Sequence, residues 1–338
     1  MTDRANLLLV LNAAKLAGRP DYIRHVAADW LSAWPGDREV TRLLAAAEGE
    51  LGFEELASGR LAALVVVDPE DPVANQALAA ILRAQGMAAR ARIFECCALA
   101  LRLTPLPEQA PVWAVSMAEA LAALRSGHSD RARRLAGEVL VADPDLPLPT
   151  LIAMKAALAD EQPEAALAHA ERGARRWPET LAFRLVQALH WIRQGENARG
   201  VEALHRCAAD DPTAAVAYRY LGGENPYMRL WPVSLVASLS RPIPADVAAV
   251  LGENRLAPAG AGTAALASEP DPAAELAAGV AISRLLHEAE GEEPAIQPKP
   301  WEAFQGPDAG AAVKNETAED VRQELQRLSV RLNAASAA

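Results

Sequence analysis

The cysteines and histidines are the residues of this chain best suited to chemistry, and their spacing decides what they could do. The closest pair is His205-Arg-Cys207, and no partner cluster accompanies it, whereas a zinc site needs three or four ligands. Cys96 and Cys97 are adjacent within a helical stretch, where neighbouring side chains point apart. This pattern favours buried structural thiols over redox work and predicts no metal site.

Motifs for nucleophilic catalysis or phosphate binding do not emerge either. The sequence has no Gly-x-Ser-x-Gly and no P-loop. The segment Gly260-Ala-Gly262-Thr-Ala-Ala265 resembles a dinucleotide fingerprint, but no strand precedes it, so a linker is the better interpretation. We therefore expect no catalytic residues, no cofactor and no enzymatic activity.

Composition bounds the class of protein. The 338 residues carry a net charge of −11 and only 4% aromatic residues, and the abundance of alanine and leucine favours helix over strand. Negative charge argues against a nucleic-acid partner. Three cysteines indicate no disulfide framework. The absence of a signal-like start and of an apolar run of eighteen residues predicts a soluble cytoplasmic protein without a membrane span.

A period of 34 residues organises the first two-thirds of the chain. Glycines at 18, 52 and 86 are 34 apart, and those at 127 and 195 are two periods apart, with Glu161 at the place between them. Prolines at 35 and 69, and at 144, 178 and 212, repeat the same step. A glycine can take the positive φ that ends a helix, and a proline stops the next one. Each unit is therefore predicted to be an antiparallel helix pair, and the units to stack.

This pattern resembles the tetratricopeptide repeat (TPR), whose period and Gly-to-Pro spacing are those seen here. Small residues recur early in the first helix at Ala45, Ala79, Ala120 and Ala188, while Leu11 and Met154 depart from the pattern and the large aromatic near each unit's start is missing. The resemblance implies an all-α fold: a right-handed α-solenoid of six TPR-like helix pairs with a capping helix, followed by a largely disordered tail. The expected units are 4–37, 38–71, 72–105, 113–146, 147–180 and 181–214, with an insertion at 106–112.

Residues 215–232 complete the predicted array, which spans 1–232. We expect a terminal capping helix at 215–224, because repeat arrays hide their last apolar face, with the segment 225–232 folded back over it. The alternative is a docking motif built from Tyr227 and Trp231.

The remainder of the chain changes character. Residues 233–315 are rich in Ala, Pro, Gly and Glu and are expected to be a low-complexity linker with short helices near 245–251 and 273–289. An amphipathic helix is expected within 316–335, where Val321, Leu325, Leu328 and Leu332 form a stripe. Trp301 and Phe304 belong to a segment that could lie in the chain's own groove.

These features favour a protein–protein interaction scaffold or adaptor. The resemblance implies that the first helices line a concave groove, and a basic groove would attract an acidic peptide or a C-terminal carboxylate; alternatively the bases only solvate helix faces. The other function considered is an N-terminal regulatory array of a signalling, transcriptional or envelope-assembly system, autoinhibited by its acidic tail. The groove positions expected to bind a protein or peptide partner are Asn12, Lys15, Arg42, Gln76, Arg83, Arg125, Lys155 and Arg193.

Overall fold

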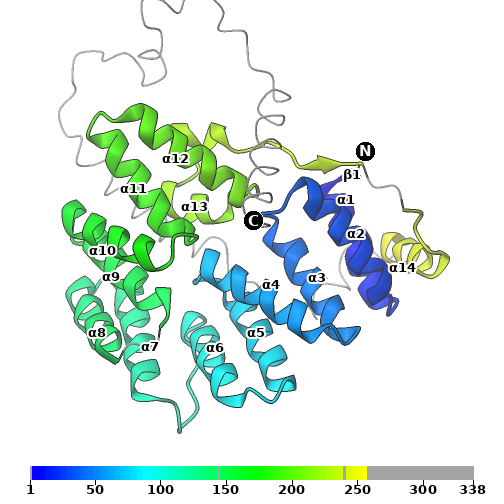
Figure 1. Ribbon diagram of the computed structural model, residues 1–338, viewed down its shortest axis with the longest axis horizontal. Coiled ribbons are helices and arrows are strands. Elements are labelled where there is room, and N and C mark those ends of the chain that lie inside the picture. The colour runs from blue at the N-terminus through cyan, green and yellow to red at the C-terminus, as the bar shows by residue number, and fades with distance from the viewer. Residues whose placement is uncertain (1, 143–144, 239–240, 257–338) are drawn as a thin grey trace, which may run out of the picture. The chain divides into compact units, whose positions relative to one another are not determined.

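The computed structural model describes residues 2–142, 145–238 and 241–256, and this part of the chain is all-α (Figure 1). It holds fourteen α-helices, one short 3-10 helix and two strands of two residues each. The predicted all-α class is confirmed. The predictions for Trp301, Phe304, a helix at 273–289 and an amphipathic helix within 316–335 concern residues outside the described part of the chain.

Twelve helices form six consecutive pairs, each within one 34-residue window of the sequence. The fourth pair begins at Val112, one residue earlier than the spacing predicts. The first helices of the pairs are α1 (Arg4–Leu16), α3 (Arg38–Glu50), α5 (Pro72–Ala84), α7 (Val112–Arg125), α9 (Pro147–Ala159) and α11 (Leu181–Arg193). The second helices are α2 (Pro20–Ala33), α4 (Glu54–Val67), α6 (Ala88–Leu101), α8 (Ser129–Ala142), α10 (Pro163–Arg176) and α12 (Asn197–Asp210).

The turn within each pair requires one residue in the left-handed region. Gly52, like the other four periodic glycines, has a positive φ, here of 83°, which is available to glycine at no steric cost. Glu161 has a φ of 56° at the place where the period lacks its glycine. The sequence register is therefore correct even in the unit whose glycine is missing.

Capping side chains define where several first helices begin. Asp37 accepts a hydrogen bond from the Val40 backbone N–H, and Asp71 accepts from the N–H groups of Val73 and Ala74. Such acceptors satisfy donors that the first helical turn leaves unpaired. The Asp37 carboxylate is fully buried. It also accepts hydrogen bonds from the Arg4 guanidinium and the Trp30 indole N–H, and so joins the first helix pair to the second.

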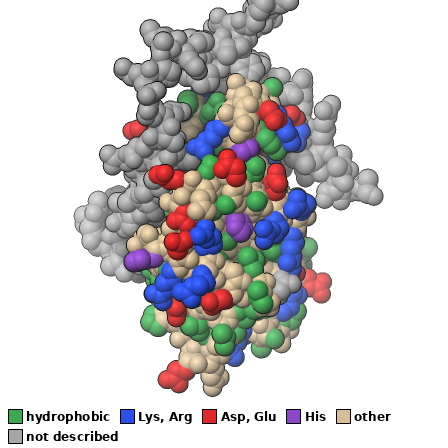
Figure 2. All heavy atoms as spheres, turned by 90° about the vertical axis from the view of Figure 1, so that its left-hand side faces the viewer, with side chains coloured by type: hydrophobic (Ala, Val, Ile, Leu, Met, Phe, Trp, Pro, Cys, Tyr) green, Lys and Arg blue, Asp and Glu red, His purple; other side chains and the backbone are tan. Residues whose placement is uncertain are grey.

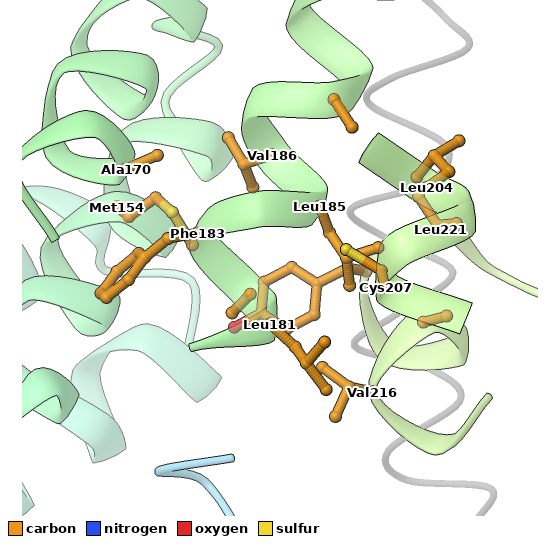
Figure 3. Packing of buried hydrophobic residues seen from close by; sticks show 14 of the residues in the cluster. Met154, Ala170, Leu181, Phe183, Leu185, Val186, Leu204, Cys207, Val216 and Leu221 are labelled. Carbon is orange, nitrogen blue, oxygen red and sulfur yellow. The ribbon is translucent and has the colours of Figure 1, made fainter. Parts of the chain in front are cut away.

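Each helix packs mainly on the helices next to it in sequence, and the apolar core runs between them. The core at the end of the array includes Phe183, Leu185, Cys207 and Leu221, all nearly inaccessible to solvent (Figure 3). All three cysteines are buried free thiols. Small side chains such as Ala166 and Ala170 allow the helices to approach closely.

The end of the sixth pair is covered by α13 (Ala215–Leu221) and the 3-10 helix η1 (Pro226–Leu230). Trp231 follows them and is 5% exposed, and its indole N–H donates to the carbonyl of Asp211 at 2.9 Å. Tyr227, Met228 and Leu230 border the same hydrophobic cluster. The segment 225–232 therefore packs against the last pair, which favours a cap over an exposed docking motif.

Residues 233–256 correct one expectation. The sequence places them in a low-complexity linker, yet they return to the start of the chain and cover the first helix pair (Figure 1). Strand β2 (Val236–Ala237) pairs antiparallel with β1 (Thr2–Asp3), and α14 (Ala245–Leu256) packs on α1. The Trp34 indole N–H donates to the carbonyl of Val236, and Val247 is fully buried. The short helix expected near 245–251 is present as α14, whereas its packing against the first helix pair is not expected from the sequence.

Replacing Glu161 by glycine is expected to raise the free energy of unfolding by about 0.5–1 kcal/mol, because a non-glycine residue in the left-handed region is strained. Thermal and denaturant unfolding would measure the change. The matched control is Glu164→Gly within the first turn of α10, which is expected to destabilise by about 0.5–1 kcal/mol because glycine weakens a helix interior. A Glu161→Gly variant no more stable than the natural chain would contradict the strain at this turn.

Candidate functional site

The 34-residue register allows the same surface to be compared from one first helix to the next. On α1, α3 and α5 several positions are exposed to solvent. Leu9 is 57% exposed and Val73 46%. We call this surface the open strip, and its exposed residues are Leu9, Asn12, Leu16, Ala46, Glu50, Val73, Ala80 and Ala84.

The equivalent positions are only partly closed in the second half of the array. At the repeat position of Asn12, Ala46 and Ala80, Leu121 on α7 is buried, and Lys155 on α9 and Leu189 on α11 are half-buried. At the repeat position of Leu16, Glu50 and Ala84, Arg125 and Arg193 stay exposed and Ala159 is half-buried. The first of these positions is therefore fully exposed in the first three helix pairs and less accessible in the last three.

Charged side chains form an interface between the second helix pair and the end of the array, which we call the charged interface. The turn between α4 and α5 carries Asp68 and Glu70, and it meets residues of α9 and α13. The Lys155 ammonium lies 2.5 Å from Glu70 Oε1, and the Tyr220 hydroxyl donates to Glu70 Oε2 at 2.8 Å. Arg219 reaches Asp68 Oδ2 at 2.5 Å. Acidic groups thus stand on one side of the interface and cationic groups with a hydroxyl on the other.

Backbone contacts hold the same two sides together. The Thr180 hydroxyl, fully buried, donates to the carbonyl of Val66 at 2.6 Å. Gly36 approaches the segment after α12 so closely that a Cβ there would lie 2.4 Å from the carbonyl oxygen of Asp210 and 2.6 Å from Pro212 Cδ. The interface therefore depends on close approach of backbone as well as on charge.

Arg38 extends the charged interface. Its guanidinium pairs with Asp68 and lies 3.8 Å from Asp211 Oδ1, while its Nε is buried without a hydrogen-bond partner. Asp211 also accepts from the backbone N–H of Val216, at the start of α13. One arginine of α3 therefore contacts carboxylates from the second and the sixth helix pair.

The carboxylates respond differently to burial. Burial would raise the pKa of Asp68, but the charges of Arg219 and Arg38 outweigh it and lower that pKa to about 2. The pKa of Glu70 is also lowered, because Lys155 and Arg219 overcome its burial. For Asp211 burial prevails over the charge of Arg38, and the pKa is raised. Asp68 and Glu70 are therefore the ionised partners on which the interface depends.

The residues expected to bind a partner fall into two groups. Asn12 and Lys15 of α1 are exposed, Gln76 of α5 is half-buried, and Arg193 of α11 is exposed. Lys155 is engaged with Glu70 and lies 5.0 Å from the centre of the Tyr220 ring. Hence the first three positions belong to the open strip or its border, and Lys155 belongs to the charged interface.

The remaining arginines on that surface have acceptors within the chain. Arg42 donates to both carboxylate oxygens of Asp71, at 3.1 and 2.8 Å. Arg83 pairs with Glu95 at 2.7 Å, and Arg125 donates to the carbonyl of Leu101 at 2.6 Å. The bases are therefore not a row of free cations.

Sequence reasoning missed Asp68, Glu70, Arg219 and Tyr220. The acidic run Asp68-Pro69-Glu70-Asp71 is the one local signal that could have drawn attention to this turn. The partners of this acidic run lie 85 to 151 positions away in the sequence. A repeat with a period of 34 residues does not predict contacts between units so far apart.

Elsewhere the surface mixes charges. Figure 2, which views the left side of Figure 1, shows basic and acidic side chains interspersed. The pairs Arg131–Glu119 and Arg199–Glu196, at 3.1 and 2.8 Å, are examples of this local neutralisation. Within 2–142, 145–238 and 241–256, no cluster of three or more His, Cys, Asp or Glu could hold a metal ion. No helix in this part of the chain is long and apolar enough to cross a membrane.

Comparison with models of known protein families, with curated proteins and with solved structures found no match to this chain.

The double substitution Asp68→Asn with Glu70→Gln is expected to lower stability most at neutral pH. The folded-state pKa of Asp68, about 2, lies below its ordinary 3.8, so its ionised form stabilises the fold above the ordinary pKa, and this contribution is lost as pH falls through the folded value. The Glu70 shift has the same sign.

Denaturant unfolding of both proteins between about pH 7 and about pH 2.5 would measure this, with a difference of about 2 kcal/mol at neutral pH that shrinks in acid. A difference that stays constant across that range would contradict the assignment. Asn and Gln preserve the shape of the side chains, so packing is not the variable.

Proposed function

We propose that this chain is a protein–protein interaction scaffold, an α-solenoid of TPR-like helix pairs that binds a partner protein on the open strip. The proposal rests on one observation: the repeat position of Asn12, Ala46 and Ala80 is exposed on α1, α3 and α5, whereas its equivalents are buried on α7 (Leu121) and half-buried on α9 and α11 (Lys155 and Leu189). Six helix pairs at a 34-residue period support the solenoid arrangement.

The chemistry of the open strip fits a protein partner. Leu9, Leu16 and Val73 expose apolar side chains, and Ala46 and Ala80 leave the helix backbone close to the surface. Apolar side chains that a partner covers on binding contribute to affinity through the hydrophobic effect. Small residues let a partner approach closely, so a partner segment with bulky apolar side chains fits best.

Polar groups at the border would orient the partner. Asn12 and Lys15 are exposed on α1, and Arg83 keeps 53% of its side chain exposed while paired with Glu95. Such rim charges act on specificity and association rate more than on affinity. An acidic rim on the partner therefore complements these positions.

Arginine at both Ala46 and Ala80 is expected to abolish partner binding, because two long charged side chains would fill the centre of the open strip. The matched control places arginine at Ala63 and Ala89, which are exposed on the second helices α4 and α6. All four sites are exposed helix positions, so stability is expected to change by less than about 0.5 kcal/mol.

The measurement is affinity purification with quantitative mass spectrometry, followed by the Kd of the recovered partner for each variant. The natural chain and the control should recover the same partner, and the strip variant should lose it by at least about a hundredfold in Kd. Equal recovery by the strip variant, or no specific partner of the natural chain, would contradict the proposal.

A further inference from the structure

We infer that the region formed by α9, the start of α11 and α13 is a second interaction surface for an acidic peptide, which the chain's own Asp68–Glu70 turn occupies in this structure. The inference rests on the proposed interaction function and adds to it a ligand class and a means of regulation. It stands on the geometry of the charged interface.

The first step of the argument is the arrangement of donors. Lys155, Arg219 and the Tyr220 hydroxyl converge on two carboxylates that are two residues apart in the sequence, Asp68 and Glu70. Two cations and a hydroxyl placed in this way can bind a turn that carries carboxylates at that spacing, as the turn closed by the Asp71 N–H and the Asp68 carbonyl does here. The turn itself defines the ligand: an acidic segment of the form Asp-x-Glu.

The second step is that the two sides of the interface belong to different parts of the array. Asp68 and Glu70 follow α4, in the second pair, and their own side supplies Arg38 to Asp68 and Arg42 to the neighbouring Asp71. The acidic turn would therefore keep cationic partners if the two sides separated. Lys155 and Arg219 would lose their carboxylate partners and would be left to pair with other anions. Separation thus favours the uptake of an outside acidic segment.

The third step concerns the floor of the site. Ala182 and Val186, at the open-strip positions of α11, are buried, and Val67 packs against their hydrophobic cluster. Opening would expose apolar side chains beside the two cations. An acidic peptide with an apolar residue next to its carboxylates would cover both, as Val67 beside Asp68 does here.

The experiment uses the full chain and a fluorescent peptide with the sequence of residues 65–73. The loop-neutral variant, Asp68→Asn with Glu70→Gln, removes the internal occupant and keeps the cations. It is expected to bind the peptide at least about tenfold more tightly than the natural chain, with affinity that falls as salt rises. Adding Lys155→Met and Arg219→Met should return binding to the natural level, and the peptide with Asn and Gln at its two acidic places should not bind.

Opening itself is measured with Thr180→Cys, which places a thiol at the buried interface. The native Cys96 and Cys97 are buried in α6, away from this interface, and report global unfolding, whereas Cys207 lies in the cluster beside it. In the loop-neutral background the alkylation rate at position 180 should rise at least about tenfold more than the rates of the native cysteines rise. Gly36→Ala, whose Cβ would collide with Asp210, should produce the same opening with all charges intact.

Two results would overturn the inference. One is a loop-neutral variant that binds the peptide no better than the natural chain does. The other is alkylation at position 180 that rises only in step with the native cysteines in both variants, because the interface would then be inseparable from the fold. The Ala46→Arg, Ala80→Arg variant should bind the peptide like its parent, so failure of the open strip as a partner surface would be seen separately.

Discussion

The arrangement of this chain depends on two buried carboxylates and the cations that face them. Asp68 and Glu70 leave water at a large desolvation cost, which is offset only because Arg38, Lys155 and Arg219 stand at hydrogen-bonding or ion-pair distance. These contacts connect the second helix pair with the fifth pair and the terminal cap. They also engage Lys155, which stands on α9 at the repeat position that Asn12, Ala46 and Ala80 occupy in the open strip.

Both ends of the array are covered, and in each case the covering residues follow the sixth helix pair in the sequence. At one end α13, η1 and Trp231 cover the last apolar face; at the other, β2 and α14 cover the first. A helix pair without a neighbour would expose the surface that stacking normally buries. The segment that follows the last repeat therefore serves both ends of the array.

Local features of the sequence could be predicted because each depends on a few adjacent residues. The positive φ at Gly52 and at Glu161 follows from the turn geometry, and the period carried it to the one unit without a glycine. Contacts between distant units could not be predicted, because the period fixes which face of a helix points inward but not how the successive pairs curve. Lys155 illustrates both cases. The repeat register predicts that its side chain points inward, whereas its pairing with Glu70 depends on how the array curves. In the same way, the composition of residues 233–315 does not predict that Val247 is buried.

The path of residues 233–256 has a consequence for synthesis on the ribosome. The covering of α1 by α14, and the pairing of Thr2–Asp3 with Val236–Ala237, join residues whose translation is separated by more than 230 positions. At ordinary elongation rates the first helix pair therefore waits roughly ten to fifty seconds for its cover. During that interval only the next helix pairs can cover Leu7, Leu11 and their neighbours, so in a nascent chain this end of the array is the one most exposed to chaperones.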